Sequence, residues 1–156
     1  MSFDKANKAL TEKGYGNRVS VYEDSCATVE LAAKTVGTEP QRIAKSLTFM
    51  VGEAPIMIVC SGDSKINGGK FRRTFGVKSK MIDFEDVNRL IGHDVGGVCP
   101  FGVKEGVKIY LDESLKRFDA VYPASGSENS MVRLTISELE DASDFEKWVD
   151  VTKLQD

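Results

Sequence analysis

The 156-residue sequence has a single histidine, and its three cysteines (Cys26, Cys60 and Cys99) are widely spaced with no CxxC pair. One histidine and scattered cysteines lack the ligand spacing of a metal site, and three cysteines cannot all pair in disulfides. Walker A, GxGxxG and GxSxG motifs are also missing. We therefore expect neither a metal nor a cofactor, and a chain that stays reduced.

Long apolar runs are absent as well. The longest, Ala54 to Cys60, has the length of a strand and not the roughly 20 residues that a membrane-spanning helix needs. The N-terminal residues Met1 to Lys5 lack the basic and then apolar order of a secretory signal. The length suits a single domain. We therefore expect one cytoplasmic domain over residues 1–156, with no membrane partner.

The net charge of −3 is unevenly distributed along the chain. Between residues 65 and 80 every charged residue is basic, namely Lys65, Lys70, Arg72, Arg73, Lys78 and Lys80. The segment after Ser137 is mainly acidic. A basic stripe on an acidic protein suits the binding of a polyanion on one face. A solvated helix face that binds nothing is the alternative interpretation.

Hydrophobic periodicity predicts both helices and strands. Residues 45–51 and 55–61 are apolar strands joined at Gly52-Glu53, a pattern typical of a hairpin. Further strands are predicted at residues 19–22, 108–111, 120–122 and 131–134, and helices near residues 3–10, 28–36, 67–75, 83–91 and 137–149. Because the two kinds of element do not alternate regularly, we expect an α+β fold with a mixed, partly barrel-like β-sheet flanked by helices.

Lys45 lies at the start of the first hairpin strand, where a period of two places it on one face with Leu47 and Phe49. A lysine on a buried strand face is costly unless its ammonium group reaches a pocket or a carboxylate. Lys45 is therefore a candidate ligand-binding cation. The alternative is a lysine at the strand end that extends into water.

The loop Gly96-Gly97-Val98-Cys99-Pro100-Phe101-Gly102 is a second candidate site. Glycine permits positive φ and close approach of a ligand, while proline stiffens the turn. Adjacent backbone amides in such a loop can bind an oxyanion or a carboxylate. A tight connection between a helix and a strand is the alternative.

Cys99 in this loop raises the hypothesis of a cysteine hydrolase. Its one possible histidine partner, His93, is six residues away in the same connection, and no dedicated general base is evident. We expect an inert thiol. Small polar residues also follow two predicted strands, at Ser61 and at Ser125-Gly126-Ser127, where they can line a pocket or satisfy their own turns.

In this order, these segments resemble the YbaK/ProX family, the free-standing relatives of the editing domain of bacterial prolyl-tRNA synthetases. The resemblance covers about residues 19–148. Arg42 to Leu47 is similar to the strand with the family's essential lysine, and Gly96 to Pro100 is similar to its GxxxP loop. Ser125-Gly126-Ser127 is similar to the late small-residue turn of its pocket, and Lys70 to Lys78 to its basic helix with a Gly-Val-Lys end.

The resemblance implies that the protein hydrolyses the ester between an incorrect amino acid and the terminal adenosine of a tRNA. It assigns catalytic roles to Lys45, Gly96 and Pro100. It implies substrate contacts from Tyr22, Ser61, Gly97, Val98, Cys99, Ser125, Gly126 and Met131. It implies contacts with the tRNA acceptor end from the six basic residues of the stripe, and it allows an aminoacyl-tRNA synthetase as a second partner.

One departure from the family leaves the amino acid open. Some members have an acidic residue a few positions after the small-residue turn, whereas Asn129 to Arg133 contains none. The alternative function is a non-catalytic module of the same fold that binds tRNA ends, nucleotides or a synthetase through the same pocket.

Overall fold

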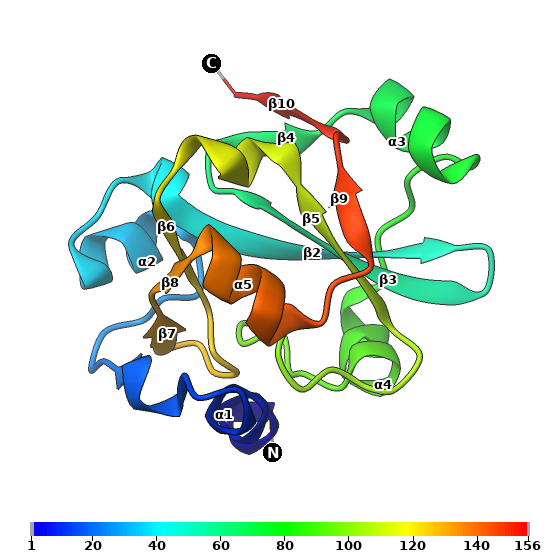
Figure 1. The fold of residues 1–156 in the computed structure, drawn as a ribbon. Coiled ribbons are helices and arrows are strands. Elements are labelled where there is room, and N and C mark those ends of the chain that lie inside the picture. Colours follow the sequence, from blue (N-terminus) through cyan, green and yellow to red (C-terminus); the bar gives the residue numbers. More distant parts are fainter. Residues whose placement is uncertain (1, 156) are drawn as a thin grey trace.

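The strands β2 (Ile43–Val51) and β3 (Ala54–Ser61) form a long antiparallel hairpin at the centre of the main sheet (Figure 1). This sheet has six strands in the order β8-β6-β2-β3-β5-β9. The other four strands are β5 (Lys108–Asp112), β6 (Ala120–Pro123), β8 (Leu134–Thr135) and β9 (Lys147–Val149). Strands β6 and β5 run parallel to their hairpin neighbours, so the sheet is mixed. The computed structural model describes residues 2–155.

Two short antiparallel ribbons accompany this sheet. Strand β1 (Val19–Val21) pairs with β7 (Ser130–Val132), and β4 (Ser64–Ile66) pairs with β10 (Thr152–Leu154). The main sheet is curled into a half-barrel that helices flank, which confirms the predicted α+β fold class (Figure 1).

Five α-helices surround the sheet. They are α1 (Ser2–Glu12), α2 (Val29–Val36), α3 (Gly68–Phe75), α4 (Val87–Ile91) and α5 (Ile136–Ser143). Side-chain caps begin α2 and α3, because Thr28 and Asn67 accept hydrogen bonds from amides in the first helical turn. No helix within residues 2–155 is long and apolar enough to cross a membrane.

The two faces of β2 contact different cores. Ala44 belongs to the larger core, with Met57 and Val59 of β3. Phe49 belongs to a second core with Phe71 of α3, and their ring centroids are 5.1 Å apart. Leu47, Phe49 and Val51 therefore face α3, and the even-numbered residues are on the face of the larger core.

The predicted helix over residues 137–149 is wrong in its second half. Helix α5 ends at Ser143, and Asp144 follows with φ 49°, a left-handed conformation. The next residues form β9, which pairs with β5 at the edge of the sheet. Strands β4, β9 and β10 were not predicted from the sequence. Each has only three residues and is stabilised by its pairing partner.

Candidate functional site

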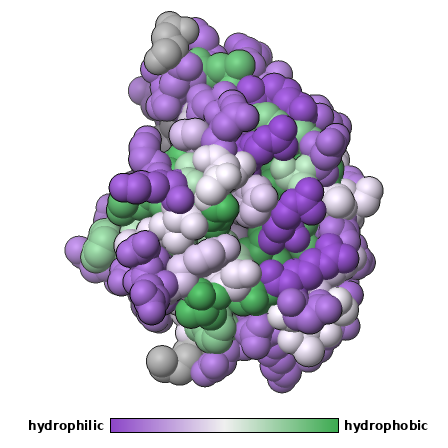
Figure 2. Space-filling model, turned by 90° about the vertical axis from the view of Figure 1, so that its left-hand side faces the viewer, coloured by the Kyte–Doolittle hydropathy of each residue, from purple (hydrophilic) through white to green (hydrophobic). Residues whose placement is uncertain are grey.

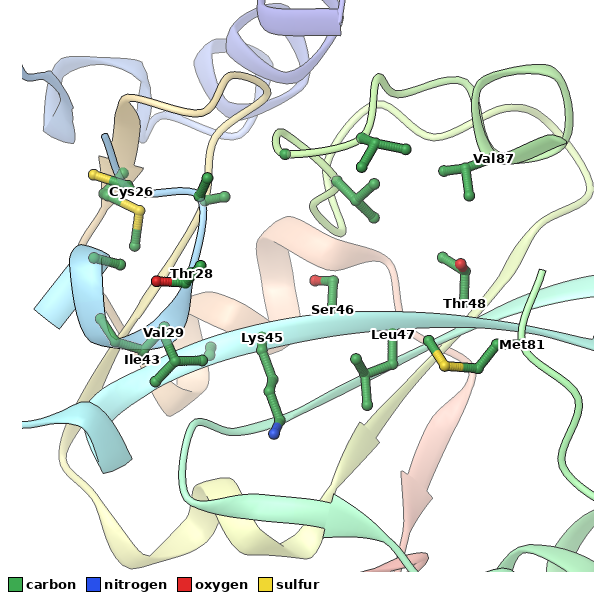
Figure 3. Close-up of a pocket in the computed structure, with 18 of the residues that line it drawn as sticks. Cys26, Thr28, Val29, Ile43, Lys45, Ser46, Leu47, Thr48, Met81 and Val87 are labelled. Atoms are coloured by element: carbon green, nitrogen blue, oxygen red, sulfur yellow. The ribbon is translucent and has the colours of Figure 1, made fainter. Parts of the chain in front are cut away.

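A cavity of about 550 Å³ runs past β2 and is lined on both faces of that strand. Lys45 and Leu47 line it from one face, and Ser46 and Thr48 line it from the other (Figure 3). Because β3 covers one edge of β2 along its whole length, a cavity that contacts both faces must pass the opposite edge. The rest of the lining comes from α2 with its preceding loop, residues 81–87, the Gly96 loop and the β6–β7 segment.

Lys45 extends from β2 on the side opposite to Ser46 and Thr48 (Figure 3). Its Nζ donates a hydrogen bond to the carbonyl oxygen of Ser64 in β4. Leu47 and Phe49 follow on the same face, as the period of two predicts. The lysine is only half-buried, so a bound ligand can reach its ammonium group.

A polar network holds the segment that Lys45 contacts. The hydroxyl groups of Ser61 and Ser64 are 2.5 Å apart, and Ser61 donates to Asp63 at 2.7 Å. Arg117 donates to both Ser61 and Asp63. Burial acts to raise the pKa of Asp63, but hydrogen bonds from Arg117 and Ser61 outweigh it and hold the pKa below its usual value. Ser61 is buried within this network and does not line the cavity.

The Gly96 loop contributes less of its length to the cavity than its motif suggests. Gly96, with φ 97°, and Val98 line the cavity, whereas Gly97, Cys99 and Pro100 are buried. The amide of Gly97 donates to the carbonyl of Asp94 at 3.0 Å, so it is not free for a ligand. The amides of Gly96 and Val98 have no acceptor among residues 2–155 and can serve one.

Gly97 serves a packing role. A Cβ at this position would lie 2.5 Å from the carbonyl carbon and oxygen of Gly126, so the two loops touch through bare backbone. Gly126 itself has φ 102°, and a Cβ there would lie 2.7 Å from Phe3 Cα in α1. The two glycines bring the small-residue turn, the Gly96 loop and α1 together.

Cys99 is fully buried, and burial raises the pKa of its thiol to about 12. His93 is also buried, which lowers the pKa of its imidazole. The Nε2 atom of His93 lies 2.6 Å from the carbonyl oxygen of Phe101, which can only accept, so this nitrogen holds the proton. Nδ1 then accepts from the Ser2 hydroxyl at 2.9 Å. Neither nitrogen is free to act as a base toward Cys99, which argues against a cysteine hydrolase.

The other predicted substrate contacts divide into two groups. Met131 is buried and lines the cavity beside Ala124. Tyr22 packs on the small cluster that contains Met131 but does not line the cavity. Ser125 and Gly126 are also away from the lining, and the buried hydroxyl of Ser125 has no partner among residues 2–155.

The basic stripe lies mainly on and around α3. All of its members except Lys70 are exposed, and the Lys70 Nζ donates to Asp150 and to the carbonyl of Thr152. Because Phe71 packs on Phe49, α3 covers the same face of β2 from which Lys45 extends. Figure 2 shows the opposite side of the molecule, which lies at the left in Figure 1 near α2 and away from α3, and hydrophilic side chains predominate there over smaller apolar patches.

Several lining residues were missed from the sequence. They are Cys26, Thr28, Val29, Ser46, Thr48, Met81, Phe84 and Val87. The period of two in β2 could have indicated Ser46 and Thr48 as the residues opposite Lys45. Phe84 is 74% exposed, but an isolated aromatic residue carries no recognisable signal. Within residues 2–155, no three His, Cys, Asp or Glu side chains are grouped as a metal site requires.

Comparisons with known proteins place the chain in a family. The sequence profile of the family described as the aminoacyl-tRNA editing domain matches residues 23–142. The chain therefore belongs to this family. YwhH of Bacillus subtilis, described as uncharacterized, is 46% identical over 154 residues, which cover 98% of each chain.

Two further relatives carry names that refer to tRNA. The proline–tRNA ligase of Limosilactobacillus fermentum is 34% identical over 95 residues, which are 57% of this chain and 17% of that enzyme. A crystal structure assigned as a candidate trans-editing enzyme for prolyl-tRNA synthetase superposes with a TM-score of 0.87 and 30% identity, and the match covers 97% of both chains.

Proposed function

We propose that this protein hydrolyses the ester bond of mischarged aminoacyl-tRNA, acting in trans as a single domain in the cytoplasm. The observation that carries the proposal is that Lys45, in a chain of the editing-domain family, lines the same cavity as Gly96 and Val98. A cation and free amides suit a carbonyl oxygen that gains negative charge. The reaction adds water to the ester and releases the amino acid and the 3′-hydroxyl of the terminal adenosine.

The lining favours a mechanism without a side-chain nucleophile. Lys45 and Cys26 are the titratable residues of the described lining, and burial raises the pKa of the Cys26 thiol. An aminoacyl ester is already reactive, so holding it beside water in the right orientation accounts for much of the acceleration. Lys45 would bind the ester carbonyl or the terminal phosphate, and the amides of Gly96 and Val98 would bind the developing oxyanion.

The basic stripe would bind the acceptor stem of the tRNA on the Lys45 face. Exposed Lys65, Arg72, Arg73, Lys78 and Lys80 are available for phosphate contacts, whereas Lys70 must first leave its partner Asp150. An aminoacyl-tRNA synthetase that delivers the tRNA is a compatible partner, given the likeness to the prolyl enzyme.

The test is a panel of mischarged tRNAs incubated with purified protein. Release of at least one amino acid by the wild type, with about 100-fold slower release by Lys45→Ala, is the expected result. Cys99→Ala is the control and should stay within a few-fold of the wild type at equal folded concentration, because Cys99 does not line the cavity. Binding of tRNA without release of any amino acid would instead support the non-catalytic module.

A further inference from the structure

The β2–β3 turn determines which backbone groups of β2 point toward the cavity. Gly52 and Glu53 form a two-residue turn, and Val51 pairs with Ala54. The residues that flank such a turn exchange both backbone hydrogen bonds, and bonded pairs then recur at every second residue. The N–H and C=O groups of Lys45, Leu47 and Phe49 therefore face β3. The N–H and C=O groups of the even-numbered residues point away from β3, toward the opposite edge of β2.

Partners occupy that opposite edge on both sides of Ser46. Ala44 pairs with Pro123 of β6. Farther along, the carbonyl of Thr48 accepts from the amide of Ile82 at 3.1 Å, and the amide of Met50 donates to Lys80 at 2.9 Å. Between them, the N–H and C=O of Ser46 have no partner among residues 2–155. The edge of the sheet is thus open at Ser46, and the N–H of Thr48 beside it also has no acceptor among residues 2–155.

This open position lies at the cavity. Ser46 lines it and is half-buried, and the neighbouring Lys45 lines it from the other face of the strand. An unpaired strand edge binds extended backbone through alternating donors and acceptors. Because Ala44 pairs with Pro123 on one side and the carbonyl of Thr48 accepts from Ile82 on the other, the opening is short and suits a single residue better than a longer peptide strand.

We propose that Ser46 binds the aminoacyl group of the substrate as if it were one residue of an adjacent strand. The Ser46 amide donates to the ester carbonyl oxygen, and the Ser46 carbonyl accepts from the α-ammonium group. This inference rests on the proposed function and names the recognised chemistry, an α-amino acid ester with a free amine.

The pairing also orients the substrate. Residues paired across a ladder place their side chains on the same face of the sheet. The amino-acid side chain would therefore lie on the face of Ser46, where Thr48 and Val87 also line the cavity (Figure 3). A carbonyl bound by Ser46 would be polarised before water attacks it.

Amide hydrogen exchange followed by NMR tests the inference on the wild-type protein. The probe is 3′-(L-alanylamino)-3′-deoxyadenosine, in which an amide replaces the labile ester and the side chain is the smallest chiral one. In the free protein the Ser46 amide should exchange about 100-fold faster than those of Lys45 and Leu47. A saturating probe should slow Ser46 by about tenfold or more and leave its two neighbours unchanged.

Two control probes separate the backbone contact from general binding. The propionyl analogue lacks the α-amine, and the N-acetyl analogue extends the backbone beyond the opening, so both should bind at least about tenfold more weakly. Binding that shifts the Gly96 and Val98 resonances without protecting Ser46 would overturn this inference and leave the proposed function intact. Absence of both binding and deacylation would overturn both.

Matched variants give an independent readout. Ser46→Pro removes the outward N–H, and proline is tolerated where the N–H of an edge strand faces away from the ladder. Deacylation by Ser46→Pro should be at least about tenfold slower than by Ser46→Ala, which keeps the amide, at equal folded fractions. Equal rates in two folded variants would contradict the contact. If Ser46→Pro does not fold, the exchange experiment decides.

Discussion

The Lys45 strand and the Gly96 loop differ in how the residues that stand out in the sequence are used. On β2, the residue that stands out in the sequence is itself at the cavity, and its ammonium group contacts Ser64, which belongs to a polar network. In the loop, Gly97 allows the backbone to pack closely on Gly126. Of residues 96–102, Gly96 and Val98 line the cavity. A motif of small residues therefore indicates close packing first, and a ligand only where its backbone amides stay free.

The packing role of the loop predicts the largest effect on stability. Gly97→Ala places a methyl group 2.5 Å from the backbone of Gly126, which cannot move without disturbing α1. We expect a loss of about 3 kcal/mol in the free energy of unfolding, measured by urea denaturation. Gly106→Ala is the control. Gly106 has φ 93° but no atom near its Cβ position, so an alanine there causes backbone strain without a clash. Equal losses in the two variants would contradict the packing role.

The Lys45 face is predicted to depend on charge. Arg72→Gln combined with Arg73→Gln should lower kcat/KM for an aminoacyl-tRNA several-fold and flatten its dependence on salt, because fewer phosphates are contacted. Arg89→Gln is the matched control on α4, where the arginine already pairs with Asp86. An aminoacylated adenosine without the tRNA body should not distinguish these variants. A similar loss in both variants would argue against a directed tRNA surface.

We expect the smallest effect on stability from the polar network of Ser61, Asp63 and Arg117, and this effect depends on pH. Because the pKa of Asp63 is held below its ordinary value of 3.8, its ion pair stabilises the fold above that pH and loses this contribution as the pH falls through the lowered pKa. Arg117→Gln should cost on the order of 1 kcal/mol at pH 7, since both side chains are about one-third exposed. Thermal unfolding from pH 3 to 7 should show the difference shrinking at low pH. A constant difference would mean that Asp63 is not the partner that matters.

Much of the fold could be predicted from the sequence, because its signals are local. The hairpin at Gly52-Glu53, the cap at Thr28 and the helix end at Gly37 follow from residue type and spacing. Strand β9 could not be predicted, since Lys147–Val149 becomes a strand only through its pairing with β5.

The site was predictable where a charged residue stood among apolar ones, as at Lys45. Its tRNA and substrate contacts remain predictions. The cavity walls depend on contacts between distant segments, and no local pattern indicates that Val87 and Met131 line the same space. Nor does the sequence reveal that the edge of β2 is open at Ser46. This depends on where β6 stops pairing with β2 and where residues 80–82 begin to do so.

We propose that Lys45 acts on the substrate, whereas Gly97 maintains the packing of its loop. The most direct measurement is the single-turnover rate of deacylation per folded molecule for wild type, Lys45→Ala and Gly97→Ala, at a temperature where all three are folded. We expect Lys45→Ala to be about 100-fold slower, with a smaller fall in melting temperature than Gly97→Ala, because the carbonyl of Ser64 loses only the hydrogen bond from Lys45. We expect Gly97→Ala to melt at a lower temperature and, because Gly97 lies between Gly96 and Val98, to lose some activity as well, but much less than Lys45→Ala loses. A folded Lys45→Ala protein with the wild-type rate would contradict the proposed role of Lys45.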